Sequence, residues 1–192
     1  MIVSGAVEGP VDDAVVRKVL RACGHEPGSI HIKNGKSGLL EKLTGYNTAA
    51  QIAPWLVLVD LNGDASCAPP FVAACLPSPA EQMIFRVAVR QVEAWLLADR
   101  SRFARFLKVS QARLPRDPDS LPDAKRVVTD IARHSSDRRI REEMVSRPGS
   151  GRKVGPAYVA RMIEFIELVW MPDDAEIRSD SLSRCLGRLR LL

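Results

Sequence analysis

The chain has 192 residues, of which 46% are hydrophobic and 27% are charged, and this is the composition of an ordinary globular protein. No apolar run reaches the length of a membrane span, and Met1–Val7 leads straight to Glu8 without the basic start and apolar core of a secretory signal. We therefore expect a cytoplasmic protein that does not cross a membrane. The formal net charge of the chain at pH 7 is +5.

β-prone segments alternate with segments of helical spacing as far as Asp99. Gly9 and Pro10 end the first strand, and Pro10 also suits the first turn of the helix that follows. This alternation is typical of an α/β fold with a mostly parallel sheet of four strands. The predicted strands are 1–7, 29–33, a third strand that follows Pro54, and 83–89; the predicted helices are 11–23, 39–52, 71–75 and one that begins at Arg90.

The stretch Trp55–Asp64 is the most informative of these segments. Five apolar residues run without a break and stop at Asp60, which Asn62 and Asp64 follow at alternate positions. A continuous apolar run that ends at a turn signal is typical of a strand buried on both faces. Open α/β sheets bind their ligands at the carboxyl ends of such strands. The simpler interpretation of the same residues is a tight turn, since Asn-Gly and Asp are both favoured in turns.

The second half of the chain is predicted to be helical. The expected helices are 100–109, 120–134, 137–145, 157–170 and 182–189, with a linker at 110–119 and a basic, glycine-rich loop at 146–156. Residues 1–99 hold 8 Lys and Arg against 10 Asp and Glu, whereas residues 100–192 hold 20 against 13. We therefore predict an α/β core at 1–109 and a basic helical region at 110–192 packed on it. The charge distribution suits a protein that binds a polyanion, although solvated helix faces would produce it too.

Acidic residues fall at three of the predicted strand ends: Glu8, then Asp60 with Asp64, then Glu93. The carboxyl ends of parallel strands lie along one edge of a sheet, so these side chains are expected to be neighbours. Carboxylates gathered in this way repel one another unless a cation is present. Mg²⁺ or Mn²⁺ would neutralise them and would support phosphodiester cleavage. The structural alternative for Glu93 is an acid favoured by a helix N-terminus.

Two other motifs are incomplete. Gly35-Lys36-Ser37 resembles the end of a phosphate loop, but Ile30 stands where that loop needs a glycine. Lys36 remains a candidate phosphate contact. A calcium loop beginning at Asp60 would need glycine where Ala65 stands and an acid where Phe71 stands, so we reject it.

The four cysteines lack the spacing of a metal site. No Cys-x-x-Cys pair is present, and no histidine lies at ligand spacing from a cysteine. We expect reduced, mostly buried thiols rather than a zinc centre at Cys23, Cys67, Cys75 and Cys185.

The chain resembles the TOPRIM superfamily at Val7–Asp12, which is similar to its Glu-Gly signature, and at Val57–Asp64, which is similar to its Asp-x-Asp motif. It resembles more closely the uncharacterised TOPRIM-like family called domain of unknown function 4276, at Val89–Asp99, Leu121–Arg126 and Ser181–Arg184. The resemblance covers nearly the whole chain, and the stretch from Glu93 to Asp99 is its most specific part.

The resemblance implies a Rossmann-like TOPRIM core, with links to nucleases of the overcoming-lysogenization-defect type and to phage defence. It implies that Glu8 is a metal ligand or a general acid or base, that Asp60 is a metal ligand, and that Glu93 is a further ligand. This sequence departs from the family at Asn62, whose amide oxygen can bind Mg²⁺ but carries no charge. Asp64 is the candidate that would compensate for this departure.

Three functional hypotheses follow. The first is a metal-dependent nuclease in which Glu8, Asp60 and Lys125 are catalytic, Asn62, Asp64 and Glu93 complete the metal ligands, and Lys36, Arg152 and Lys153 bind nucleic acid. The second is a nucleic-acid-binding module without hydrolytic activity that works with a separate ATPase partner, since the chain holds no complete nucleotide-binding motif. The third is a phosphotransfer or nucleotide-hydrolysing enzyme that uses the same acids.

Overall fold

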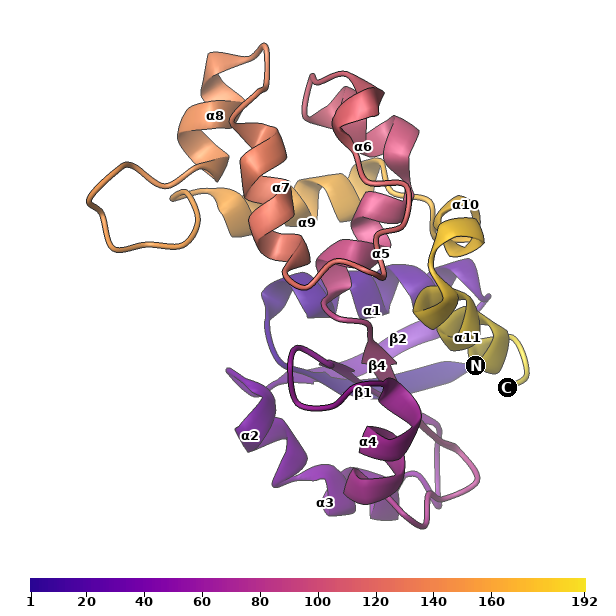
Figure 1. Cartoon of the computed structure of the whole chain (residues 1–192). Coiled ribbons are helices and arrows are strands. Elements are labelled where there is room, and N and C mark those ends of the chain that lie inside the picture. Colours follow the sequence, from indigo (N-terminus) through magenta and orange to yellow (C-terminus); the bar gives the residue numbers. More distant parts are fainter.

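A computed structural model describes residues 1–192 and contains a four-stranded parallel sheet flanked by helices (Figure 1). The predicted α/β fold is therefore confirmed. No helix combines the length and the apolar surface that a membrane crossing requires. The strands are β1 (Ile2–Val7), β2 (Glu26–Ile32), β3 (Trp55–Asp60) and β4 (Met83–Ala88). The helices are α1 (Pro10–Ala22), α2 (Lys36–Leu40), α3 (Leu43–Ala49), α4 (Ala68–Cys75), α5 (Val92–Ala98), α6 (Arg100–Phe106), α7 (Ala124–Ala132), α8 (Arg138–Met144), α9 (Tyr158–Leu168), α10 (Pro172–Ala175) and α11 (Asp180–Leu189), with short 3₁₀ turns η1 (Gln111–Arg113) and η2 (Glu176–Arg178).

The strand order is β2-β1-β3-β4, and all neighbouring strands are parallel. From β1 the chain first moves outward to β2 and then returns to the other side of β1 to form β3 and β4. The order therefore reverses between β1 and β3. In open α/β sheets the crevice beyond the carboxyl ends of two such strands is the usual ligand site. Glu8 follows β1 and Asp60 ends β3, so both lie at this crevice.

Strand β3 is buried on both faces, as its unbroken apolar sequence predicts. Leu56 and Leu58 belong to the hydrophobic core on one face of the sheet, which includes α1, α5 and α9. Val57 and Val59 belong to the smaller core on the other face, beneath α2 and α3. The alternation of side chains along a strand produces this division.

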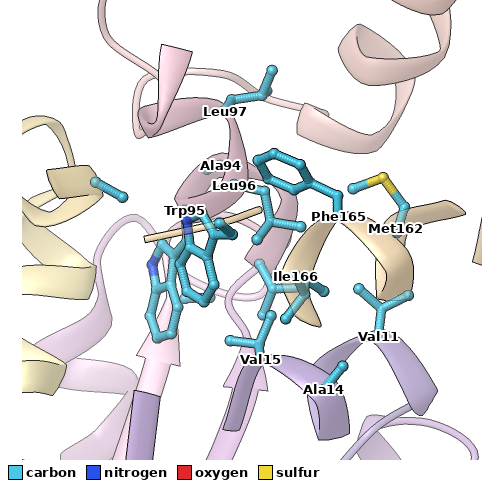
Figure 2. Close-up of a cluster of buried hydrophobic side chains, with 14 of the residues drawn as sticks. Val11, Ala14, Val15, Ala94, Trp95, Leu96, Leu97, Met162, Phe165 and Ile166 are labelled. Atoms are coloured by element: carbon cyan, nitrogen blue, oxygen red, sulfur yellow. The ribbon is translucent and has the colours of Figure 1, made fainter. Parts of the chain in front are cut away.

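The C-terminal helices share the larger core with the sheet. Val11 and Val15 of α1 face Phe165 and Ile166 of α9, and Trp95 of α5 lies beside them (Figure 2). These side chains are almost fully buried. The contacts place α9 directly over α1, and therefore place the start of α9 near the carboxyl end of the sheet.

Several predicted boundaries differ from the structure. The helix predicted at 39–52 is two short helices, α2 and α3. Strand β2 begins at Glu26 rather than Ser29, because an edge strand tolerates the missing N–H of Pro27. Helix α7 begins at Ala124 rather than Ser120, because the Asp123 side chain accepts a hydrogen bond from the Arg126 N–H at 2.9 Å and caps it.

A buried hydroxyl ties α11 to the core. Ser181 Oγ accepts hydrogen bonds from Trp95 Nε1 at 2.7 Å and from the Val89 N–H at 3.3 Å. We expect Ser181→Ala to lower the free energy of unfolding by about 1–3 kcal/mol, because both donors lose their partner in the protein interior. Ser183→Ala on the same helix is the control and should change it by less than about 0.5 kcal/mol. Urea unfolding measures both, and equal effects would contradict this role for Ser181.

Candidate functional site

Four carboxylates gather at the carboxyl edge of the sheet. Glu8 follows β1, Asp60 ends β3 and Glu93 lies in the first turn of α5, just beyond β4. The fourth is Asp12, in the first turn of α1. The charges of Glu8, Asp12 and Glu93 all act on Asp60. Three acids predicted from separate strand ends are therefore neighbours in space. We call these four residues the carboxylate cluster.

Backbone hydrogen bonds hold three of these side chains in place. Glu8 Oε1 accepts from the Asp60 N–H at 2.9 Å, which links β1 directly to β3. Asp60 Oδ1 accepts from the Val92 N–H at 2.9 Å, at the start of α5. Asp12 Oδ2 accepts from the N–H of Gly9, the N-cap of α1, at 2.8 Å, as the acid at the third helical position does in a capping box. Each of these bonds uses one carboxylate oxygen and leaves the second one for another ligand.

Glu93 is held by side chains instead. It is buried, with 3% of its surface exposed, although it carries a carboxylate. Its Oε1 accepts a hydrogen bond from the Tyr158 hydroxyl at 3.2 Å and lies 3.7 Å from Lys125 Nζ. The Lys125 ammonium also lies 5.5 Å from the centre of the Tyr158 ring. Residues from α5, α7 and α9 thus meet at this point.

The electrostatics of the cluster disfavour its negative charge. Burial raises the pKa of Asp60 well above its ordinary value, and the charges of Asp12, Glu93 and Glu8 raise it further. Burial and the charge of Glu93 raise the pKa of Asp12 to about 7. Lys125 is the only cation that forms an ion pair with any of the four acids. One ammonium group against four carboxylates leaves an excess of acid that an added cation would relieve.

The donor set suits a hard divalent cation, because carboxylate oxygens are the ligands that Mg²⁺ and Mn²⁺ prefer. In this structure, however, no three of the Asp, Glu, His or Cys side chains are arranged to hold a metal ion. Binding a metal therefore requires carboxylate side chains to turn their second oxygens toward a common point. The main chain already brings the side chains of Glu8, Asp60 and Glu93 close together. Their oxygen atoms and their negative charge match what a divalent cation requires, although the oxygens do not yet surround one point.

The other two predicted ligands have partners of their own. Asn62 adopts a left-handed conformation with φ 52°, and its Oδ1 accepts a hydrogen bond from Gln91 Nε2 at 3.3 Å. Asp64 forms an ion pair with Lys36, whose ammonium also donates to the Leu61 carbonyl at 3.3 Å. The predicted set therefore divides: Glu8, Asp60 and Glu93 converge, whereas Asn62 and Asp64 are engaged elsewhere. Lys36 is likewise neutralised by Asp64.

The two remaining predicted phosphate contacts lie on the loop between α8 and α9. Arg152 is exposed, and its N–H donates to Ser150 Oγ at 3.3 Å within the loop. Lys153 lines a groove that Lys125 also lines, so the structure brings these two lysines to one place. Arg152 does not line this groove.

Sequence reasoning missed three residues of the site. Asp12 was visible as an acid in the first turn of a helix that follows Glu8, at a spacing of four residues. Tyr158 carried no signal beyond its place on an apolar helix face. Gln91 accepts a hydrogen bond from the Lys125 N–H at 3.0 Å through Oε1, and so joins the turn after β3 to α7. No sequence pattern predicts that Gln91 contacts both of these segments.

Comparisons with protein-family models, with curated proteins and with solved structures found no match for this chain. The resemblance to TOPRIM-like proteins therefore stays an expectation from the sequence.

Proposed function

We propose that this chain is a Mg²⁺- or Mn²⁺-dependent enzyme that cleaves phosphodiester bonds in nucleic acid. The observation that carries the proposal is the convergence of Glu8, Asp60 and Glu93 from separate strand ends, joined by Asp12, with a single lysine to offset their charge. A structural cluster would gain stability from neutral or paired groups at these positions. Acids whose pKa is raised by burial and by like-charged neighbours, as for Asp60 and Asp12, are instead typical of functional sites.

The roles of the residues follow from their surroundings. Glu8, Asp12, Asp60 and Glu93 would hold the cation through the oxygens that their present hydrogen bonds leave free. When bound, the cation would polarise the phosphodiester, lower the pKa of an attacking water and stabilise the leaving oxygen. Lys125 is placed to contact a non-bridging phosphate oxygen, because its ammonium lies at the edge of the carboxylate cluster. Tyr158 orients Glu93.

A second function is favoured by the arrangement of the oxygens. Since no three acids surround one point, the chain could serve as a binding module without hydrolytic activity. The sequence resemblance would then fit a TOPRIM-like segment that acts in phage defence beside a separate ATPase. A phosphotransferase or nucleotide hydrolase using the same acids is less well supported, since the basic second half of the chain favours a polymeric substrate.

The test is cleavage of plasmid DNA, single-stranded DNA and RNA. We expect the wild-type protein to cleave at least one of them with Mg²⁺ or Mn²⁺ and none of them with a chelator. The control is the double variant Glu8→Gln/Asp60→Asn, purified in the same way. Cleavage that survives the loss of both carboxylates would refute the assignment. Equal binding of nucleic acid with and without a chelator, in the absence of any cleavage, would favour the binding module.

A further inference from the structure

A basic groove adjoins the carboxylate cluster. Its volume is about 430 Å³. One wall is a face of α7 that contributes Lys125, Arg126 and Thr129, continued by Arg133 at the C-cap of this helix. The other wall is the loop before α9, which contributes Lys153. This volume lies in the range of small-ligand sites. The groove and the cluster share Lys125, whose ammonium lies 3.7 Å from Glu93 Oε1.

The groove carries an excess of positive charge. Four cations line it, against the two acids Asp123 and Asp130. Asp123 is occupied as the cap of α7, and Asp130 lies 3.4 Å from Arg133 and 3.7 Å from Arg126. Lys153 forms no ion pair. The cations are therefore incompletely neutralised on the side that faces solvent.

The loop wall is anchored to the core. Val154 packs against the larger hydrophobic core, and the Gly155 N–H donates to the Met144 carbonyl at 2.9 Å. Any side chain at Gly155 would collide with the backbone of Glu143. This close approach fixes the end of the loop against α8. Lys153 is thus held opposite α7 by packing, which distinguishes it from a lysine on a free loop.

We propose that this groove binds the sugar-phosphate backbone of one nucleic-acid strand, next to the phosphate held at the carboxylate cluster. The inference rests on the proposed function for the position of the reacting phosphate. The lining cations match phosphate oxygens, and no aromatic side chain is present to stack on a base. Binding is therefore independent of sequence. The strand runs from the carboxylates past Lys125 and along α7 toward Arg133.

The experiment measures binding of a short fluorescein-labelled oligo-dT strand by fluorescence anisotropy, in the presence of a chelator so that no cleavage occurs. We expect the double variant Arg133→Ala/Lys153→Ala to bind on the order of 10- to 100-fold more weakly than the wild-type protein. The slope of log affinity against log salt should fall by about 1.4, because each lost phosphate contact on a single strand contributes about 0.7.

The matched control removes the same charge from another basic cavity, of about 450 Å³, which Arg17 and Arg21 line at the far end of α1. Arg17→Ala/Arg21→Ala should leave the affinity within about twofold of wild type, as expected for surface cations away from the bound strand. An equal loss of affinity in both variants would contradict binding in the groove. It would indicate instead a general attraction between the basic protein surface and the oligonucleotide. Wild-type affinity in the Arg133/Lys153 variant would overturn it as well.

Two further arms separate this inference from the proposed function. One outcome is that the Arg133→Ala/Lys153→Ala variant binds weakly as expected while the wild-type protein cleaves nothing with Mg²⁺ or Mn²⁺. That result would support strand binding in the groove and contradict the catalytic proposal. If the variant binds and cleaves nucleic acid like the wild-type protein, the catalytic proposal is supported and strand binding in the groove is contradicted. A duplex of the same length decides whether the groove accepts one strand alone or one strand of a pair.

Discussion

Asp60→Asn is expected to abolish cleavage and, at the same time, to stabilise the protein in the absence of metal. Loss of a charged ligand at the metal should reduce the rate at least about 1,000-fold, because a metal ion contributes several kcal/mol to transition-state stabilisation. The free energy of unfolding should rise by about 0.5–2 kcal/mol above neutral pH. The gain follows because burial and three neighbouring acids disfavour the charged form of Asp60.

The asparagine keeps the local geometry, since its side-chain oxygen can still accept the hydrogen bond from the Val92 N–H. Asp13→Asn is the matched control, because Asp13 lies on α1 but forms an ion pair with Arg17 at 2.9 Å. It should leave the cleavage rate near wild type. An Asp60→Asn protein that cleaves at the wild-type rate would remove Asp60 from the reaction. A variant that loses both activity and stability would show that Asp60 serves the fold.

Stability without metal is expected to fall as pH rises from about 4 to about 7. Folding raises the pKa of Asp12 from 3.8 to about 7. The folded protein therefore binds more protons than the unfolded chain within this window, and the free energy of unfolding decreases as pH increases. Asp60 acts in the same direction. The loss attributable to Asp12 is at most about 4 kcal/mol. The contribution of Asp12 to stability is fully present below about pH 4 and is lost above about pH 7.

Mg²⁺ should reverse this loss, since the cation binds the ionised carboxylates of the folded protein and not the unfolded chain. Urea unfolding with a chelator and with Mg²⁺, at a series of pH values from about 4 to about 8, measures the effect. Asp12→Asn should flatten the profile obtained with chelator. Glu41→Gln, at an exposed position at the end of α2, should not. A profile that rises toward neutral pH would contradict the charge excess described for the cluster.

The strand ends could be predicted from the sequence because the signals are local. The apolar run at Trp55–Val59 identifies a central strand, and the acids that follow it and follow β1 need only the parallel direction of the sheet to become neighbours. Glu93 follows by the same reasoning from β4. These predictions depend on the order of elements and on which ends share an edge, and both can be inferred from alternation along the chain.

The rest of the site depends on packing between distant segments. Tyr158 reaches Glu93 because α9 packs over α1, and no local pattern specifies that contact. Lys125 and Lys153 form one groove because Gly155 closes the loop onto α8. Asp64 shows the opposite case. Its spacing from Asp60 suggested a shared ligand set, but Lys36, which lies 28 residues earlier, engages its carboxylate.

The most direct test of the central claim is a crystal structure of the protein soaked in Mn²⁺, with the metal located by its anomalous scattering. The account predicts a peak at the carboxyl edge of the sheet, in contact with oxygens of Glu8 and Asp60 and beside Asp12 or Glu93. It also predicts that these side chains turn relative to the arrangement described above. A crystal with Mn²⁺ bound elsewhere and the four acids unmoved, or with a lysine or arginine paired directly with Glu8 or Asp60, would contradict the claim that a divalent cation completes this site.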